Sequence, residues 1–521
     1  MQRTERRPPV LCQSSRPFSA DQVPAPEAVQ HGTMAQFPNH PMFRGFNRPL
    51  RIECEVFELE YEGRIPEALN GAFYRCGPDP QFPPRDPNDL GINGDGYVSS
   101  FRFQNGHVDF CQRYVRTDKF NEERKARRAL FGAYRNPFTD DPSVAGVDRT
   151  TANTSTIWYD GRLLACKEDG LPHELHPETL QTLGKFNFGG GLRMPAVTAH
   201  PKVDPYTGEL VFYGYECSGL AAADAAYCVA TADGRLLRED WFALPYPAMI
   251  HDFAITRNYV IFPIMPTTSN LERMKAGGDH WRWDPSLPTL LGVMPRDGKV
   301  EDIRYLRGPA RWSFHTMNAF EESGKILLDT TVAVANAFFK HIDGTPGNPA
   351  ATPFYLTRWT CDLQGKADGF SETRLYALPS DFYSVDPRYV GRRYRYGFMA
   401  VKEPAQPQST LAPSSFNCVG RIDHHTGDVE TFFVGEEAVV QEPVFVPAGP
   451  KSAEGAGYLL AVVNRLLENR GDLIILDAMK LAAGPVAVVR LPLLMRMAFH
   501  GNWVPEATLE RARARQTPEL Q

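Results

Sequence analysis

Short β-rich runs separated by turn signals recur along this chain from about residue 50 onward, and they limit the folds open to it. The runs are rich in β-branched and aromatic residues, and many follow tight turns such as YDGR, YTGE, ESGK and HTGD, which is the sequence signature of β-hairpins. Clear examples are residues 161–166, 208–216, 258–265, 324–333, 428–434, 457–463 and 472–478. Helical periodicity is scarce, and residues 118–132 and 501–515 are the best helix candidates. The sequence therefore predicts an all-β protein.

The number of these runs and the lack of an obvious boundary between them favour a closed array such as a β-propeller. A chain of several β-sandwiches is the alternative that the same pattern allows. We expect one propeller domain over residues 41–508, a disordered extension over residues 1–40 and a disordered tail over residues 509–521. Whether the first 33 residues are native is left open, because Met34 precedes a sequence that looks like a natural start.

Composition excludes several classes of function. The formal charge is −6 and no basic stripe stands out, which argues against nucleic acid as a partner. The nine cysteines include no C-x-x-C pair, so neither a disulfide framework nor a thiolate zinc site is expected. No window has the roughly 18 apolar residues that a membrane span needs. We expect a cytoplasmic protein without a transmembrane segment, and we leave open whether it is a homodimer.

Four histidines stand in similar settings far apart in the sequence: His200, His251, His315 and His500. Each lies in or beside an apolar, strand-like run bounded by Pro, Gly, Asn or Asp. No single helix or knuckle could join them, but the innermost strands of a propeller all face one axis, where such residues could converge. Taken singly, each fits a hydrogen-bonded core histidine better than a metal ligand. Imidazole suits Fe, Zn, Cu and Ni alike, so the pattern does not name a metal.

Metal-bound histidines usually donate their second ring N–H to a carboxylate. Glu168 in LLACKEDG and Glu442 in VVQEPVFVP are acidic residues within apolar segments and meet that description. Asp381 in LPSDFYSVDPRY is a weaker candidate. For all three, a surface carboxylate beside a turn is the alternative interpretation.

Ten ordered blocks carry a family resemblance, and they include all four histidine contexts: LNGAFYRCGPDPQFPP, INGDGYVSSFRF, FGAYRNPFTDDPSV, TTANTSTIWYDGRLLACKEDG, TAHPKVDPYTGE, MIHDFAITRNYVIFP, FHTMNAF, VDPRYVGRR, QEPVFVP and FHGNW. With these blocks the chain resembles the carotenoid cleavage oxygenase family from about residue 40 to 505, and within it the stilbene-cleaving (lignostilbene dioxygenase) branch. The resemblance implies a seven-bladed β-propeller with a loop and helix cap over an axial metal site.

The resemblance also implies a non-haem Fe(II) cofactor, with His200, His251, His315 and His500 at the ligand positions. Glu168, Asp381 and Glu442 match the carboxylates that orient three of these histidines, and Thr154 in TANTST matches a residue that obstructs one further position on the iron. Asp381 stands where the family usually has Glu, and its reach is about 1.5 Å shorter. We therefore expect a bridging water or a shifted backbone at this contact.

Two further residues match a pair that binds the 4-hydroxyl of the substrate in stilbene-cleaving relatives: Tyr134 in FGAYRNPFTDD and Lys167 in LLACKEDG. An ammonium group near a phenol favours the phenolate, which would push electrons into the alkene. The alternative for Lys167 is an ion pair with Glu168 or Asp169, although neighbours on a strand point to opposite faces, so Glu168 is the less suitable partner. For Tyr134, the sequence alone favours a loop or core aromatic residue.

The walls of the cavity are predicted with less support. Phe314, Phe339 and Phe499 are candidates for contacts with flat aryl rings, and ordinary core packing explains them equally well. Ile92 stands where stilbene-cleaving relatives often have an aromatic residue. The smaller isoleucine would widen one end of the cleft.

The predicted function is therefore an Fe(II)-dependent dioxygenase that uses O₂ to cleave the central C=C bond of 4-hydroxystilbenes into two aromatic aldehydes. Lignostilbene and resveratrol-like compounds are the expected substrates, as in the catabolism of lignin-derived aromatics. Cleavage of an apocarotenoid or of a phenylpropene such as isoeugenol is the alternative within this class. A non-catalytic propeller that serves as a binding module is the alternative from another class, and it predicts a protein that takes up no iron.

Overall fold

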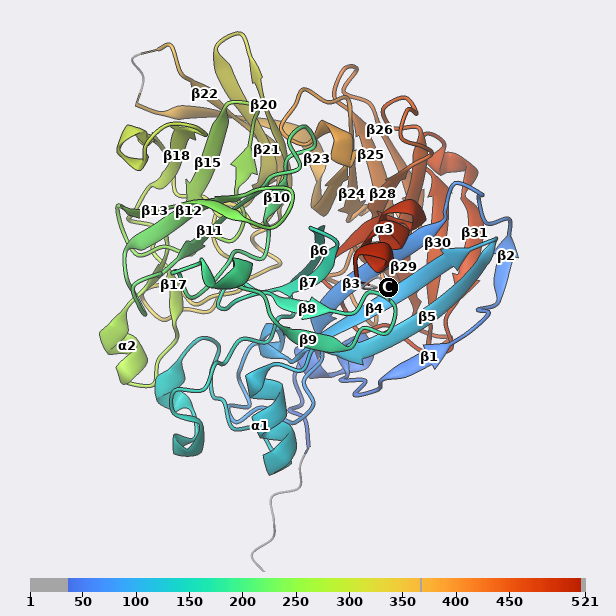
Figure 1. Cartoon of the computed structure of the whole chain (residues 1–521), viewed down its shortest axis with the longest axis horizontal. Helices are drawn as coiled ribbons and strands as arrows, with labels where there is room; N and C mark the ends of the chain where they lie inside the picture. Colours follow the sequence, from blue (N-terminus) through green and yellow to red (C-terminus); the bar gives the residue numbers. More distant parts are fainter. Residues whose placement is uncertain (1–35, 366–367, 517–521) are drawn as a thin grey trace, which may run out of the picture. The chain divides into compact units, whose positions relative to one another are not determined.

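Antiparallel hairpins make up most of the computed structural model, which describes residues 36–365 and 368–516 (Figure 1). The chain divides into two units, Met1–Gln36 and Phe37–Gln521, and all the sheets lie in the second. The seven runs chosen from the sequence are all strands, so the all-β prediction is confirmed. In the YDGR turn, for example, Asp160 and Gly161 both have positive φ, 49° and 72°, as a two-residue hairpin turn with the right twist requires.

The sheets follow one another along the chain. The first contains β1 (Cys54–Val56), β3 (Gly71–Pro78), β4 (Gly96–Gln104), β5 (His107–Tyr114) and β32 (His500–Pro505). The second contains β6 (Ser155–Tyr159), β7 (Arg162–Cys166), β8 (His173–Leu175) and β9 (Thr182–Lys185). The third contains β10 (Lys202–Val203), β11 (Leu210–Tyr215), β12 (Asp224–Ala230) and β13 (Leu236–Ala243). The fourth contains β14 (Ala254–Ile255), β15 (Tyr259–Ile264), β18 (Thr289–Pro295) and β19 (Arg304–Gly308), and β16 (Thr267–Ser269) pairs with β17 (Trp281–Trp283) as a separate ribbon.

The long strand β23 (Phe370–Val385) joins the next two sheets, because its first part pairs with β22 and its second part with β24. On one side lie β20 (Thr316–Glu322), β21 (Lys325–Val332) and β22 (Tyr355–Asp362), and on the other β24 (Tyr396–Val401), β25 (Cys418–Asp423) and β26 (Val429–Phe433). The last sheet contains β2 (Tyr61–Gly63), β27 (Ala438–Val440), β28 (Val444–Pro447), β29 (Gly457–Arg465), β30 (Arg470–Asp477) and β31 (Pro485–Arg490).

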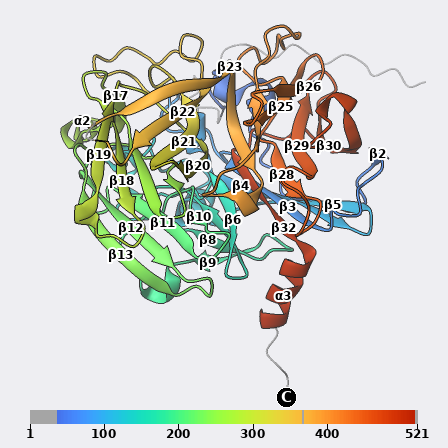
Figure 2. The same cartoon turned by 90° about the horizontal axis from the view of Figure 1, so that it is seen from above.

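The two ends of this unit are joined through the sheets. The C-terminal strand β32 pairs with β3 in the first sheet (Figure 2), and the second strand, β2, pairs with β31 in the last (Figure 1). The first and last sheets also pack on each other through the apolar side chains of β3, β4, β29 and β30 (Figure 1). Six further apolar clusters lie between successive sheets, from the first pair to the last. The core is therefore divided among the sheet-to-sheet interfaces.

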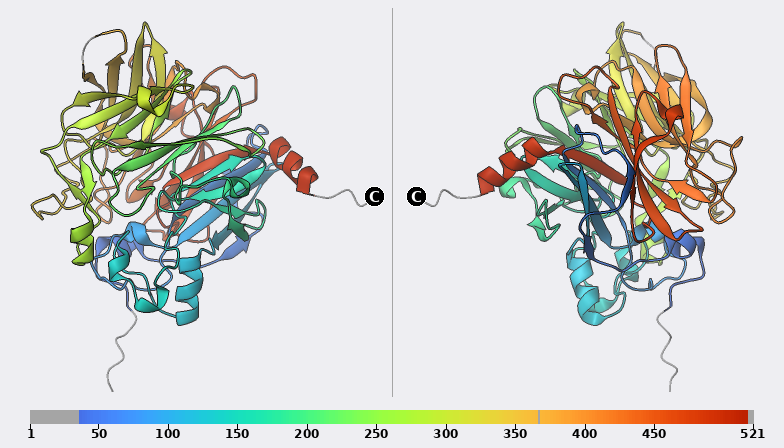
Figure 3. Two further views of the ribbon diagram at one scale, coloured as in Figure 1. Left: turned by 60° about the vertical axis from the view of Figure 1, so that its left-hand side comes forward. Right: turned by 90° about the vertical axis from the view of Figure 1, so that its right-hand side faces the viewer.

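Three α-helices occur in the described residues: α1 (Asp118–Ala126), α2 (Leu271–Lys275) and α3 (Glu506–Gln516), with α1 outside the sheets (Figure 3). The helix predicted over residues 118–132 is too long, because Arg127 adopts the left-handed conformation (φ 54°) that ends α1. The helix predicted from residue 501 begins only at Glu506, since His500–Pro505 pair with β3 as β32. The expected disordered tail is accordingly wrong for residues 509–516, which belong to α3, whereas residues 517–521 lie outside the described residues.

Most of the predicted extension, residues 1–35, also lies outside the described residues. The eight cysteines in the described part of the chain are all free, as the sequence predicts. Over that same part, no helix combines the length and the apolar character needed to cross a bilayer.

Candidate metal centre

The four predicted ligand histidines meet at one point although they come from four different sheets. His200, His251 and His315 lie just before the edge strands β10, β14 and β20, and His500 begins the edge strand β32. One ring nitrogen from each lies within 4.8 Å of those from the other three. The Nε2 atoms of His200 and His251 are 3.1 Å apart, as are those of His315 and His500.

Three of the four rings are held by buried carboxylates through Nδ1. His251 lies 2.7 Å from Oε2 of Glu168, and His500 lies 2.7 Å from Oε1 of Glu442. Glu442 is fixed in turn by the backbone N–H of Gly501, which donates to its Oε2 at 2.8 Å. An Nδ1–H bonded to a carboxylate leaves the lone pair on Nε2, the atom that points toward the other histidines.

The third carboxylate, Asp381, contacts its histidine directly. Nδ1 of His315 lies 2.8 Å from Oδ1 of Asp381, and the Thr331 hydroxyl donates to the same oxygen at 2.9 Å. Of the two expected solutions, a bridging water or a shifted backbone, the structure has the second. The strand register shifts between Asp381 and Ser384, and Phe382 has a φ of 55°, so a β-bulge accompanies the shorter side chain.

The donor set suits a divalent transition metal. Burial and the three neighbouring imidazoles hold the pKa of His200 well below its usual range, so the ring is neutral and its lone pair is available. Four imidazoles, three of them oriented through Nδ1, are ligands that Fe, Zn, Cu and Ni all accept. The residues present therefore fit a bound metal ion, and the carboxylates behind them balance part of its charge.

Tyr134 and Lys167 come together beside this centre. The Nζ atom of Lys167 lies 5.1 Å from the centre of the Tyr134 ring, and both side chains are buried. Lys167 also forms an ion pair with Asp169, with 2.9 Å between Nζ and Oδ2. This is one of the two ion pairs weighed from the sequence, whereas Glu168 turns to His251, as strand alternation predicts.

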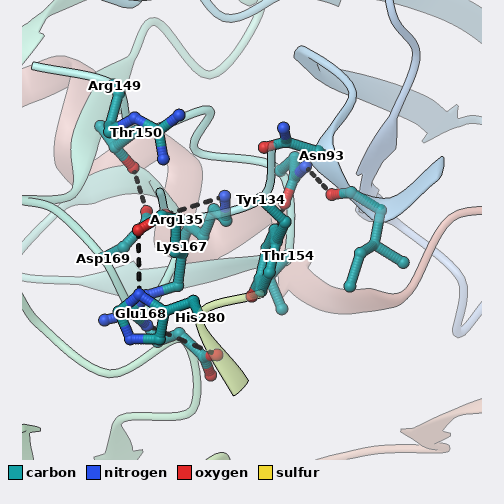
Figure 4. Close-up of polar contacts among 12 residues, drawn as sticks. Asn93, Tyr134, Arg135, Arg149, Thr150, Thr154, Lys167, Glu168, Asp169 and His280 are labelled. Carbon is teal, nitrogen blue, oxygen red and sulfur yellow. Dashed lines mark hydrogen bonds and ion pairs between the residues drawn. The ribbon is translucent and has the colours of Figure 1, made fainter. Parts of the chain in front are cut away.

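A buried network that the sequence did not reveal lies behind Glu168 (Figure 4). Arg135 donates to Tyr215 Oη at 2.8 Å and to Oε2 of Glu216 at 2.9 Å, and its Nη1 lies 3.9 Å from Oε1 of Glu168. His280 contacts both carboxylate oxygens of Glu216 at 3.0 Å. The only available signal for Arg135 was its place next to Tyr134 in the FGAYRNPFTDD block.

Of the aromatic residues predicted to line the cavity, Phe314 lies at the metal centre and Phe339 lies at Tyr134. Phe314 packs edge-on against the His251 ring, with 5.3 Å between centroids, and Phe339 stacks on Tyr134 at 6.2 Å. Phe499 precedes His500, and its amide donates to the Cys76 carbonyl at 2.8 Å.

Phe382 is a further aromatic residue at the centre that the sequence analysis missed. Its ring centroid lies 5.3 Å from that of His315 and 5.8 Å from that of His500. The residue follows Asp381 directly, and its side chain faces the histidines because the backbone takes a positive φ that an ordinary strand pattern does not predict.

Thr154 and Ile92 are linked through Asn153. The Asn153 side-chain amide donates to the carbonyls of Ile92 at 2.8 Å and Gly94 at 2.7 Å, and its oxygen accepts from the Thr154 hydroxyl at 3.1 Å. The Thr154 backbone N–H donates to the Cys166 carbonyl, just before Lys167. Thr154 therefore lies on the same framework as the Tyr134–Lys167 pair (Figure 4).

Comparison with known proteins identifies the family of this chain. The family model described as RPE65, retinal pigment epithelial membrane protein, matches residues 47–505. The chain is 46% identical to an isoeugenol monooxygenase of Pseudomonas nitroreducens over 90% of this chain and 98% of that protein. It is 44% identical to lignostilbene-alpha,beta-dioxygenase isozyme III of Sphingomonas paucimobilis over 91% of this chain and 99% of that protein.

Among solved structures, the lignostilbene dioxygenase of Pseudomonas brassicacearum superposes with a TM-score of 0.88 at 43% identity, covering 90% of this chain and 99% of that one. These relatives are named as oxygenases and are matched over nearly their whole length. They therefore favour an enzyme over the non-catalytic binding module. The chain belongs to the carotenoid cleavage oxygenase (RPE65) family and is an oxidoreductase of the type that cleaves alkenes.

Proposed function

We propose that the protein is a non-haem Fe(II) dioxygenase that cleaves the central C=C bond of 4-hydroxystilbenes. One alkene and one O₂ give two aromatic aldehydes, so both oxygen atoms enter the products and no external reductant is needed. The observation that carries the proposal is the buried Lys167 ammonium beside the Tyr134 ring, next to four converging histidines. A hydrocarbon substrate would offer no acceptor to the Lys167 N–H donors that its ion pair with Asp169 leaves open.

In this proposal, His200, His251, His315 and His500 hold the iron, and Glu168, Asp381 and Glu442 orient three of them. The bound Fe(II) would supply the capacity to activate O₂ next to the alkene. Thr154 would restrict access to one position on the metal. The protein's own work is then to position the substrate and to exclude bulk water.

Tyr134 and Lys167 would bind the 4-hydroxyl group and so fix the alkene relative to the histidines. Phe314 and Phe339 are placed to contact flat aryl rings, since one packs on His251 and the other on Tyr134. Ile92 and Phe499 would complete the walls at the Asn153 and His500 ends.

We further infer that the sheets are the blades of a seven-bladed propeller, with the histidines on its axis. The two sheets that the long strand β23 joins count as separate blades. Seven apolar interfaces, the last of them between the final and first sheets, support a closed array. The segment between β5 and β6, which carries α1 and Tyr134, would form the cap. A single propeller domain over residues 41–508 and a cytoplasmic location remain predictions.

Cleavage of isoeugenol is the second candidate. Two observations favour it: the similarity to isoeugenol monooxygenases, and Ile92 in place of a larger aromatic residue. Isoeugenol also carries a phenolic hydroxyl para to its alkene, so the Tyr134–Lys167 pair suits it equally. An apocarotenoid has no such group, and Lys167 argues against it.

The test is an aerobic assay of the Fe(II)-loaded enzyme with lignostilbene, resveratrol, isoeugenol and an apocarotenal, with the aldehydes identified by mass. We expect the highest kcat/KM for a 4-hydroxystilbene, with one atom from ¹⁸O₂ in each aldehyde when exchange with water is corrected. Preferential cleavage of isoeugenol would assign the second candidate, and cleavage of the apocarotenal alone would refute both.

A further inference from the structure

The Lys167–Asp169 ion pair is fully enclosed and has a second support. The two side chains are 3% and 9% exposed, and Nζ lies 2.9 Å from Oδ2. The Thr150 hydroxyl donates to the other carboxylate oxygen, Oδ1, at 2.8 Å (Figure 4). Asp169 is thus fixed at both oxygens, and of the three Lys167 N–H donors, two are left for a ligand.

Asp169 is the carboxylate that neutralises Lys167. Two other cations face Lys167, Arg135 and Arg149, and each has a carboxylate of its own. Arg135 pairs with Glu216 at 2.9 Å, and Arg149 pairs with Asp140 at 2.8 Å. Burial, aided by these two guanidinium groups, lowers the pKa of Lys167 although Asp169 raises it. The ammonium therefore depends on Asp169, and the pair has no net charge to offer an anion.

The pKa of the Tyr134 hydroxyl shows how the groups next to this pair act on a phenol. Burial raises the pKa of Tyr134 well above its usual value, and the carboxylates of Glu168, Asp169 and Asp89 raise it further, with Arg135 opposing them. Glu168 is bonded to His251, so Asp169 is the carboxylate of this set that contacts Lys167. A substrate phenol between Tyr134 and Lys167 meets the same groups.

We propose that Asp169 is a specificity-determining positioning residue, which makes the phenol site accept a neutral phenol rather than a phenolate. The inference deepens the proposed function and rests on it. It replaces the expectation of phenolate binding drawn from Lys167 alone. A phenolate beside the neutral Lys167–Asp169 pair would be an uncompensated buried anion, whereas a phenol only exchanges hydrogen bonds. The para oxygen of the neutral phenol still donates electrons into the alkene.

The test uses ligand binding under anaerobic conditions, so that the Fe(II)-loaded enzyme does not turn over. The probe is 3,5-difluoro-4-hydroxystilbene, whose fluorines lower its phenol pKa, and whose phenolate absorbs at longer wavelength than the phenol. Binding and absorption spectra are recorded from one pH unit below to two units above the probe's own pKa. The proteins are wild type, Asp169→Asn, Lys167→Met and Asp118→Asn, the last making the same change in the exposed Lys185–Asp118 pair.

Wild type and Asp118→Asn are expected to bind the probe with the spectrum of the neutral phenol, and Kd should rise about tenfold per pH unit above the probe's pKa. In Asp169→Asn the probe phenolate can take the place of the lost counter-ion beside Lys167, so the bound probe should show the phenolate spectrum. Either of two results overturns the inference: a phenolate spectrum in wild type, or the same spectrum in Asp169→Asn as in wild type. Unchanged affinity in Lys167→Met would instead refute the phenol site of the proposed function.

Discussion

Nδ1 of His315 lies 2.8 Å from Oδ1 of Asp381, although aspartate is one methylene shorter than the glutamates that contact His251 and His500 at 2.7 Å. The β-bulge after Asp381 and the Thr331 hydroxyl place this carboxylate where a longer side chain would otherwise be needed. The three carboxylate contacts are therefore equivalent in length, and His315 is held as closely as His251 and His500.

Replacing Asp381 by Asn should lower the affinity for Fe(II) by about 10–100-fold, the usual cost of losing a carboxylate that orients a metal-bound histidine. The measurement is anaerobic competition with a chelator. Asp381→Glu should also weaken binding, because the bulge already supplies the reach and the added methylene must be accommodated in a closed space. Equal metal affinity in Asp381→Asn and wild type would show that His315 is oriented by other contacts.

The strands are predictable because they lie in local patterns of alternating residues and turns, whereas the roles of the four histidines and their three carboxylates come from the family resemblance of the blocks that carry them. Arg135 and Phe382 escape such reasoning for physical reasons. Arg135 finds Glu216 and Glu168 only after folding, and both Arg135 and Phe382 have a positive φ, 55° in each case, that ordinary residues seldom adopt. The end of α1 at Arg127 is missed for the same reason.

Metal binding should stabilise the folded protein, since the four Nε2 atoms converge only when the sheets are assembled. Fe(II) at about 100 times its Kd should add about 2.7 kcal/mol to the free energy of unfolding. The measurement is the unfolding transition under anaerobic conditions with increasing Fe(II). His500→Ala removes one ligand and should abolish most of the shift. A shift of equal size in His500→Ala would mean that the ion binds elsewhere.

Lys167→Met should reduce kcat/KM selectively for substrates with a free 4-hydroxyl. A hydrogen bond to a charged group contributes about 1.5–3 kcal/mol, which corresponds to a loss of roughly 10- to 150-fold. A 4-methoxystilbene, which cannot donate a hydrogen bond from that position, should show a much smaller change. Iron content is measured in parallel, so that a general loss of metal is recognised. An equal loss for both substrates would assign Lys167 a purely structural role.

Glu216 should make the fold sensitive to acid. Burial alone would raise its pKa, but the hydrogen bond and charge of His280 and the charge of Arg135 lower it from 4.5 to about 2. A carboxyl group with a lowered pKa stabilises the fold fully above its unfolded pKa, and this contribution is lost as pH falls from about 4.5 toward 2. In denaturant unfolding at pH 6, 5, 4 and 3, Glu216→Gln should therefore be clearly less stable than wild type at pH 6, and the difference should shrink at each step below pH 5. A difference that stays constant over this range would show that the variant loses packing rather than the charge interaction with Arg135.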